Sequence, residues 1–180
     1  MKTALDAGHG SNTGARANGL IEDEVALDMV SRIGHYLRLA CWETVLTRPG
    51  HRLVGITERA RIARYASADI FLSVHCNASK SAACGVEAFV ASGDERSRKL
   101  AAKLVGAVAK NGLRNRGVKW DSQSQHSRLG VLRGTYRRMP SVLLELGFLT
   151  SPYDAMLLKD NHFRDAVAKL IAEVLEQDRA

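Results

Sequence analysis

Four ionisable side chains stand at or inside short apolar runs that are far apart along the chain. His9 comes shortly after the run Thr3 to Leu5 and has a glycine on each side, so its ring is presented rather than packed. Glu22 closes the polar loop that follows, and His75 ends a second apolar run. Glu145 lies between two leucines inside a third run. Two histidines and one glutamate with a fourth position open form the ligand pattern of catalytic zinc sites, because structural sites are closed by four protein ligands.

This pattern predicts a hydrolytic centre. A catalytic zinc ion lowers the pKa of a water that it binds to about 7. A carboxylate within a buried strand is costly unless a cation or hydrogen bonds compensate it, which makes a purely structural Glu145 hard to explain. We therefore predict that His9, Glu22 and His75 hold a metal ion and that Glu145 takes and returns protons beside it.

Taken singly, the same residues have structural interpretations. His75 at a strand end is also compatible with a hydrogen-bonded core histidine, and Glu22 at a helix start favours the helix dipole. Cys76 follows His75 directly, and successive strand residues point to opposite faces, so we expect Cys76 to face away from the site. Other polar residues are candidates for orienting a histidine ring or a loop, or for binding substrate: Asp6, Asn77 and Glu87. Arg133 is either a substrate-binding residue or a salt-bridge partner. His126 lies in an irregular loop and is expected to be exposed, with an approach to the metal or substrate as the alternative.

The elements that must position these residues alternate between strand and helix. Apolar runs of strand length are expected at 3–5, 42–47, 69–75, 86–91, 129–133 and 141–146. Helices are expected at 20–40, at 57–67 with Thr57 as the cap, and at 94–112, 151–158 and 163–175. The segment 113–128 is polar and irregular, which indicates a surface loop. This alternation predicts a single-domain, three-layer α/β/α sandwich around a largely parallel sheet, in which sites form outside the carboxyl ends of strands.

Composition limits the partners. The chain has 180 residues, 46% of them hydrophobic, and a formal net charge of +7, which favours an anionic partner such as nucleic acid, an acidic membrane or an anionic cell wall. No basic stripe with interleaved aromatic residues is visible, which argues against nucleic acid. No stretch is long enough to span a bilayer, and no secretion signal opens the sequence. Three cysteines without a C-x-x-C pair favour neither disulfides nor a structural zinc site.

Several short motifs together resemble one enzyme family in order and spacing. They include Asp6-Ala7-Gly8-His9-Gly10, Gly19-Leu20-Ile21-Glu22, Leu46-Thr47-Arg48, Glu58-Arg59, Ser73-Val74-His75-Cys76-Asn77-Ala78, Gly85-Val86-Glu87, Val131-Leu132-Arg133 and Leu144-Glu145-Leu146-Gly147-Phe148-Leu149. The chain thus resembles the zinc-dependent N-acetylmuramoyl-L-alanine amidases over nearly its whole length. The resemblance implies a mixed, mostly parallel sheet of about six strands. It also implies that His9, Glu22 and His75 bind Zn²⁺ and that Glu145 is the catalytic glutamate.

The resemblance also implies a substrate, the amide between the lactyl group of N-acetylmuramic acid and the L-alanine of the peptidoglycan stem peptide. On that basis residues 1–180 form one catalytic domain, expected to be monomeric, that acts on the cell wall outside the cytoplasm and binds neither nucleic acid nor membranes. With no secretion signal in this chain, it would be part of a longer secreted precursor or an endolysin. Two alternatives stay open: a zinc peptidase or carboxypeptidase acting within the stem peptide, and a wall-binding module without catalysis.

Overall fold

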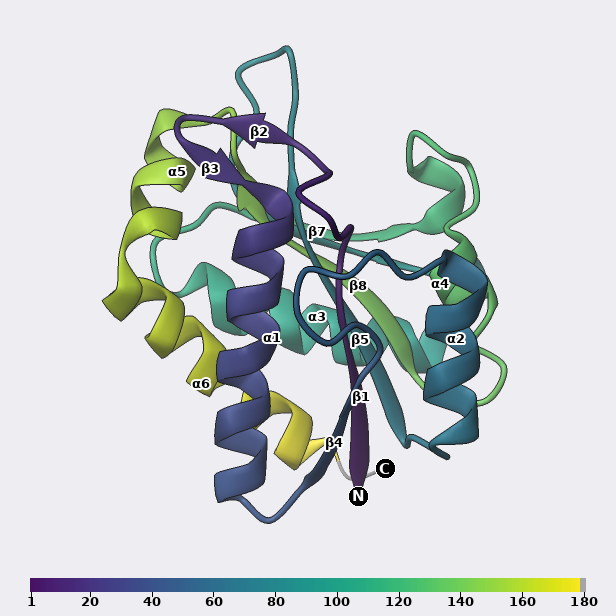
Figure 1. Cartoon of the computed structure of the whole chain (residues 1–180). Helices are drawn as coiled ribbons and strands as arrows, with labels where there is room; N and C mark the ends of the chain where they lie inside the picture. The colour runs from purple at the N-terminus through teal and green to yellow at the C-terminus, as the bar shows by residue number, and fades with distance from the viewer. Residues whose placement is uncertain (179–180) are drawn as a thin grey trace.

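The computed structural model describes residues 1–178, which form a central sheet with helices on both faces (Figure 1). The six strands of the sheet lie in the order β4, β1, β5, β8, β6, β7. Their bounds are Lys2–Ala7 for β1, Glu43–Leu46 for β4, Ile70–Asn77 for β5, Val86–Val90 for β6, Asn115–Trp120 for β7 and Ser141–Phe148 for β8. Strands β4, β1, β5 and β8 are parallel to one another, β6 runs antiparallel to β8, and β7 is parallel to β6. The mixed, mostly parallel sheet is as predicted.

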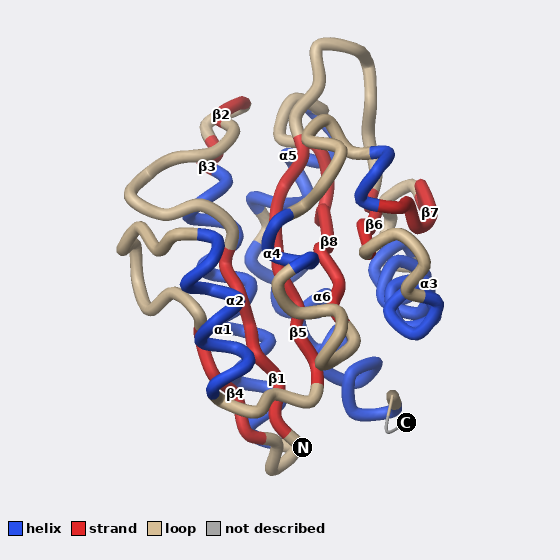
Figure 2. Tube along the Cα trace, turned by 90° about the vertical axis from the view of Figure 1, so that its right-hand side faces the viewer, coloured by secondary structure: helices blue, strands red, loops and turns tan. Residues whose placement is uncertain are grey.

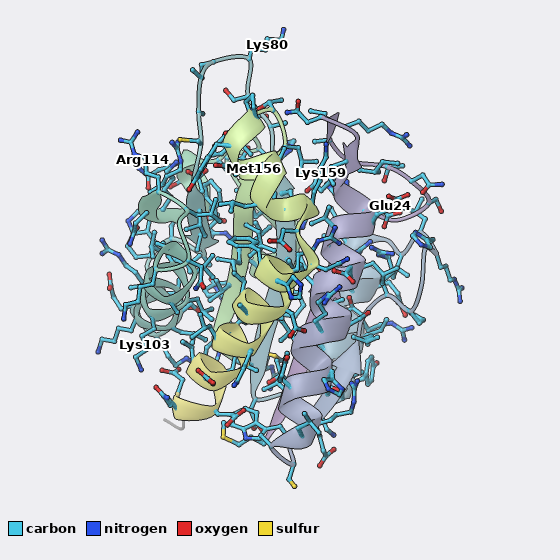
Figure 3. The ribbon with its side chains drawn as sticks, turned by 90° about the vertical axis from the view of Figure 1, so that its left-hand side faces the viewer. Glu24, Lys80, Lys103, Arg114, Met156 and Lys159 are labelled. Atoms are coloured by element: carbon cyan, nitrogen blue, oxygen red, sulfur yellow. The ribbon has the colours of Figure 1, made fainter. Side chains whose placement is uncertain are left out.

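The helices form two layers. Their bounds are Glu22–Leu39 for α1, Ile56–Tyr65 for α2, Glu95–Ala109 for α3, Gly130–Arg133 for α4, Pro152–Lys159 for α5 and Asn161–Gln177 for α6. In Figure 3, α1 and α6 lie side by side over one face of the sheet, where α3 and α5 also pack. In Figure 2, α2 and α4 lie over the other face. The three-layer α/β/α sandwich is therefore confirmed.

A hydrophobic core lies on each side of the sheet because the inner strands are buried on both faces. The residues of β5 from Ile70 to Val74 are all buried, which is what a continuous apolar run in a parallel strand predicts. The larger core packs α1, α3, α5 and α6 against the sheet, and the smaller one packs α2 and α4 against it. Cys76 belongs to the larger core and is 2% exposed, so its side chain does face away from the site.

Two sequence predictions fail in the segment before β8. Residues 113–128, expected as an irregular loop, contain strand β7 and the short 3-10 helix η1, Asp121–Gln123. The predicted strand at 129–133 is instead the one-turn helix α4, whose C-terminal residue is Arg133. A third difference is smaller: α2 starts at Ile56 with Gly55 as its N-cap, so Thr57 lies inside the helix and does not cap it.

The carboxyl ends of β1, β5 and β8 meet at one edge of the sheet, the upper edge in Figure 1. The small ribbon of β2, Arg16–Ala17, and β3, Leu20–Ile21, stands beside this edge and leads directly into α1. The loop that carries Lys80 projects from the same end (Figure 3). Among residues 1–178, no helix has the length and apolar character that crossing a bilayer requires.

Candidate metal and catalytic site

His9, Glu22 and His75 converge at the carboxyl edge of the sheet. The Nε2 atom of His9 lies 3.0 Å from Oε2 of Glu22, and Nδ1 of His75 lies 3.0 Å from Oε1 of the same carboxylate. One donor atom from each of the three residues falls within 4.8 Å of the other two. The side chains of His9 and His75 are 34% and 18% exposed, so the cluster opens to solvent.

The chemistry of these donors fits a zinc ion. Two imidazole nitrogens and one carboxylate oxygen are a known catalytic ligand set. With ligands at about 2.0–2.2 Å from zinc, tetrahedral donor atoms lie about 3.4 Å apart. The separations between Glu22 and each imidazole are 3.0 Å, and all three donors lie within 4.8 Å of one another, so the cluster is of the size that one ion requires.

Glycines keep the space around the cluster open. A Cβ atom built on Gly8 would lie 2.5 Å from Nδ1 of His75, inside van der Waals contact. A Cβ on Gly14 would lie 2.8 Å from Oε2 of Glu22, and Gly14 has a φ of +92°, which side chains rarely adopt. The polar loop after β1 can therefore fold closely over the cluster only because these two positions lack a side chain.

The cluster strongly favours the ionised form of Glu22. Burial alone would raise the pKa of this carboxyl, but hydrogen bonds from His75 and His9 outweigh that effect and lower its pKa. Backbone N–H groups of Ala15 and Cys76 also donate to its two oxygens, at 2.9 and 3.2 Å. For His75, burial lowers the pKa, but the hydrogen bond to Glu22 and the charge of Glu145 raise it overall. Glu22 is thus a fixed, oriented anion between two imidazoles.

Glu145 lies beside the cluster on the neighbouring strand. It pairs in register with His75 across β5 and β8, and both residues line one groove of about 720 Å³. Its Oε2 atom is buried and has no hydrogen-bond partner in the described part of the chain. Burial, reinforced by the nearby charges of Glu22 and Glu87, raises the pKa of Glu145 to about 7. An unpartnered carboxylate with this pKa can accept and release protons near neutral pH.

Two buried arginines hold the backbone around His9, and sequence reasoning assigned them no role. Arg48 is fully buried, pairs with Asp23 at 2.6 Å and donates to the carbonyl of Gly8. Arg59 pairs with Asp6 at 3.0 Å and donates to the carbonyl of His9. The only indication in the sequence was that both arginines lie in motifs that carry the family resemblance.

The remaining candidates occupy different places. The Asp6 carboxylate, a candidate for orienting a histidine ring or a loop, accepts hydrogen bonds from Thr47, Ser73 and Arg59. Arg59 in turn donates to the carbonyl of His9, so Asp6 acts on the loop. Asn77 and Glu87 lie next to Glu145, and the Asn77 amide donates to Glu87 at 3.0 Å. His126 is exposed, as expected, and lies at the rim of the groove.

Arg133 is engaged in a salt bridge. Its Nε and Nη2 atoms donate to the two oxygens of Asp121 at 2.6 and 2.7 Å. Asp121 also accepts from Ser92, and these hydrogen bonds lower its pKa against the effect of burial. Of the two sequence interpretations of Arg133, the salt-bridge partner is the one that the structure shows.

A family model described as N-acetylmuramoyl-L-alanine amidase matches residues 3–177. The chain belongs to this family. It is 36% identical over 172 residues to the N-acetylmuramoyl-L-alanine amidase LytC of Bacillus subtilis, which aligns 93% of this chain with 33% of LytC. It is 34% identical over 178 residues to the endolysin of Bacillus phage SPP1, which aligns 94% of this chain with 62% of the endolysin. This chain therefore spans about a third of LytC and less than two thirds of the phage protein.

Solved structures of family members have the same fold. N-acetylmuramoyl-L-alanine amidase AmiC2 of Nostoc punctiforme superimposes with a TM-score of 0.87 at 27% identity, covering 98% of this chain and 96% of AmiC2. The catalytic domain of CwlV, an N-acetylmuramoyl-L-alanine amidase from Bacillus (Paenibacillus) polymyxa, superimposes with a TM-score of 0.86 at 28% identity and the same coverage. The family resemblance noted in the sequence is thereby confirmed.

Proposed function

We propose that this chain is a zinc-dependent amidase that hydrolyses the bond between N-acetylmuramic acid and L-alanine in peptidoglycan. The observation that carries the proposal is the unpartnered oxygen of Glu145 in the same groove as His9, Glu22 and His75. Family membership supports the choice of substrate. Residues 1–180 would form one catalytic domain that acts on the cell wall outside the cytoplasm, as a monomer and without nucleic acid or membrane partners.

His9, Glu22 and His75 would hold the zinc ion. Such an ion supplies a Lewis acid that polarises the scissile carbonyl and increases the acidity of water. Glu145 removes a proton from the attacking water, whose oxygen forms a bond to the carbonyl carbon. As the carbon–nitrogen bond breaks, Glu145 returns that proton to the departing amine of L-alanine. The products are a free lactyl carboxylate on the sugar and an intact stem peptide with a free amino terminus.

Mass spectrometry of purified peptidoglycan after digestion tests the proposal. We expect intact stem peptides that begin with L-alanine, and we expect a chelator to abolish their release and added Zn²⁺ to restore it. Release of shortened peptides, with L-alanine still joined to the sugar, would instead indicate the peptidase alternative. Absence of any product from metal-loaded protein would favour the wall-binding module.

Replacing Glu145 by glutamine tests the role of the carboxylate. Because general acid–base catalysis contributes about 10²–10⁴-fold to a rate, we expect Glu145→Gln to lower kcat at least 100-fold. Zinc content, measured by elemental analysis, should stay at the wild-type level because Glu145 is not among the three clustered donors. Glu24→Gln is the matched control, since Glu24 is exposed on α1 and points away from the molecule (Figure 3). Wild-type turnover by Glu145→Gln would contradict the assignment.

A further inference from the structure

A second groove, of about 330 Å³, adjoins Glu145 on the side away from His75 and is lined in part by Arg116 and Lys119. A row of charged side chains crosses the sheet toward it. His75 pairs in register with Glu145, and Glu145 pairs with Glu87 on β6. Arg116 and Lys119 of β7 follow next, and each forms an ion pair with Glu87, at 2.5 and 2.7 Å.

An irregularity in β7 places both cations on one face. Val86 pairs with Asn115 and Ala88 with Val118, so β7 has one residue more than β6 in this interval. The bulge is at Gly117, which has a φ of +77° and whose N–H donates to the Asn115 side chain at 2.8 Å. Residues three apart in a regular strand point to opposite faces, so without the bulge Arg116 and Lys119 would not both reach Glu87.

The two cations exceed what Glu87 needs for neutralisation. One buried carboxylate faces two positive side chains, and the Asn77 amide donates to it as well. Neither cation forms an ion pair with Glu145. Their side chains are 26% and 31% exposed. The guanidinium carbon of Arg116 lies 4.8 Å from the centroid of the Phe148 ring, which is a cation–π contact. On the β7 side of this groove, Arg116 and Lys119 therefore carry one positive charge more than Glu87 neutralises, and Glu145 lies on its opposite side.

The groove on the other side of Glu145 has a different character. Its walls carry apolar side chains, among them Leu53, Ile56 and Val131. The arginine that lines it, Arg59, is 5% exposed and is used by Asp6 and by backbone carbonyls. Among the described residues that line these two grooves, the partly exposed arginine and lysine side chains are therefore those on the β7 side.

The register also sets a distance. Strand β7 lies two strand spacings from β8, or about 10 Å, because neighbouring strands are about 4.8 Å apart. An extended peptide advances about 3.3 Å per residue, so this distance corresponds to about three residues. We propose that Arg116 and Lys119 bind a carboxylate on the second or third residue of the stem peptide and so select acidic stems. The proposal rests on the proposed amidase function.

Matched synthetic substrates test this inference. Two pairs of soluble muramoyl tripeptides are needed, one differing only in a free carboxylate or a carboxamide on the second residue and one differing likewise on the third. We expect the wild type to prefer the acid over the amide in at least one pair, by about 10-fold or more in kcat/KM and mainly through KM. In Lys119→Gln the preference should fall to less than about 3-fold, and Lys119→Arg should restore it. Lys99→Gln, on the exposed side of α3, controls for loss of one positive charge.

The outcomes separate recognition from a structural role. If Arg116 and Lys119 only hold Glu87, Lys119→Gln will slow the acid and the amide equally, and the inference is overturned. Equal kcat/KM for acid and amide in both pairs with the wild type overturns it without any variant, so misfolding of Lys119→Gln does not prevent a decision. If the wild type releases no peptide that begins with L-alanine from any of these substrates, the proposed function itself is overturned.

Discussion

Glu145 is an ionisable residue at a buried position of the sheet, where its ionised form is disfavoured. Burial raises the pKa of this carboxyl to about 7, from an ordinary value of 4.5. The raised pKa helps a group that must accept a proton and give it back near neutral pH. It also means that folding places a carboxylate where its charged form is disfavoured, so Glu145, the catalytic residue that we propose, should lower stability.

The metal-free protein should show this effect as a pH-dependent difference. Between pH 4.5 and 7 the folded state holds a proton on Glu145 that the unfolded state has released, so stability is lost as pH rises through this interval. Glutamine does not titrate, so at pH 8 Glu145→Gln should unfold with a free energy higher than that of the wild type by up to about 3 kcal/mol. Urea unfolding with chelator present measures this value.

Two controls define the test. At pH 4 the carboxyl is mostly protonated in both states, so the difference between wild type and Glu145→Gln should shrink to below about 1 kcal/mol. Glu24→Gln, with its exposed side chain, should show little change between the two pH values. An equal advantage for Glu145→Gln at pH 4 and pH 8 would mean that packing, and not ionisation, separates the variants.

Gly8 makes a prediction at the same scale because its missing side chain leaves room for the His75 ring. A methyl group there would lie 2.5 Å from Nδ1 of His75, so the ring must turn or move. We expect Gly8→Ala to weaken zinc binding about 10-fold or more. Removing the groups that orient a metal ligand lowers metal affinity by about 10- to 100-fold, and moving the His75 ring should cost at least as much. Competition with a chromophoric chelator gives the affinity. Gly106→Ala is the control, because a Cβ atom added at this position of α3 would meet no other atom within 4 Å, and it should leave the affinity unchanged. Equal losses in both variants would contradict the steric argument.

The loop between β1 and α1 depends on buried charge as well as on glycine. Arg48 has no exposed surface and links the N-terminal part of α1, through Asp23, to carbonyls at the end of β1. Arg48→Met would leave the buried carboxylate of Asp23 without its cation, so we expect a loss of about 3–5 kcal/mol in unfolding free energy. Thermal or urea denaturation measures the loss.

A second substitution checks the cause of that loss. Asp23→Asn in the Arg48→Met background removes the unpaired charge, so the double variant should regain part of the lost stability. If the double variant is less stable than Arg48→Met alone, the charge of Asp23 is not what destabilises the single variant.

Sequence patterns predict the inner strands and long helices because one uninterrupted pattern runs through each of them. Strands β5 and β8 are continuous apolar runs, and α1 repeats apolar residues every three or four positions. Strand β7 was missed because the extra residue at Gly117 interrupts its alternation. The apolar residues at 129–133 predict a strand and not helix α4, because a single helical turn is too short to show a period of 3.6.

The same reasoning explains which site residues could be predicted. His9 follows one predicted strand and His75 ends another, and parallel strands bring their carboxyl ends to one edge of the sheet, so the order of elements alone predicts that the two residues lie close together. Arg116 and Lys119 could not be found this way, since their shared face depends on a bulge that only the register reveals. The burial of Arg48 could not be predicted either, because its place before Pro49 and Gly50 indicates only a turn.

At the scale of the whole molecule, the formal net charge of +7 should affect binding of the cell wall, the polymeric substrate that we propose, more than binding of a small fragment. An intact anionic cell wall presents many negative groups to the protein at once, whereas a small soluble fragment presents few. Electrostatic attraction between exposed charges is screened within about 10 Å at 0.1 M salt and within about 3 Å at 1 M. Salt should therefore weaken association with walls much more than it weakens binding of a fragment inside the groove.

We expect the rate of wall lysis to fall at least several-fold between 0.05 and 0.5 M NaCl, as estimated from this screening. Hydrolysis of a soluble muramoyl peptide whose stem carboxylates are amidated should change by less than about 2-fold over the same range, since few charges are screened. Turbidity of a wall suspension gives the first rate and chromatography of the released peptide gives the second.

Exchanging two exposed lysines on α3 and α6, Lys99 and Lys169, for glutamate lowers the net charge by four without changing a residue that lines either groove. This exchange should lower the lysis rate at low salt only. If both substrates lose activity in parallel as salt rises, the ionic strength is acting on the catalytic groove and the surface charge has no part in wall binding.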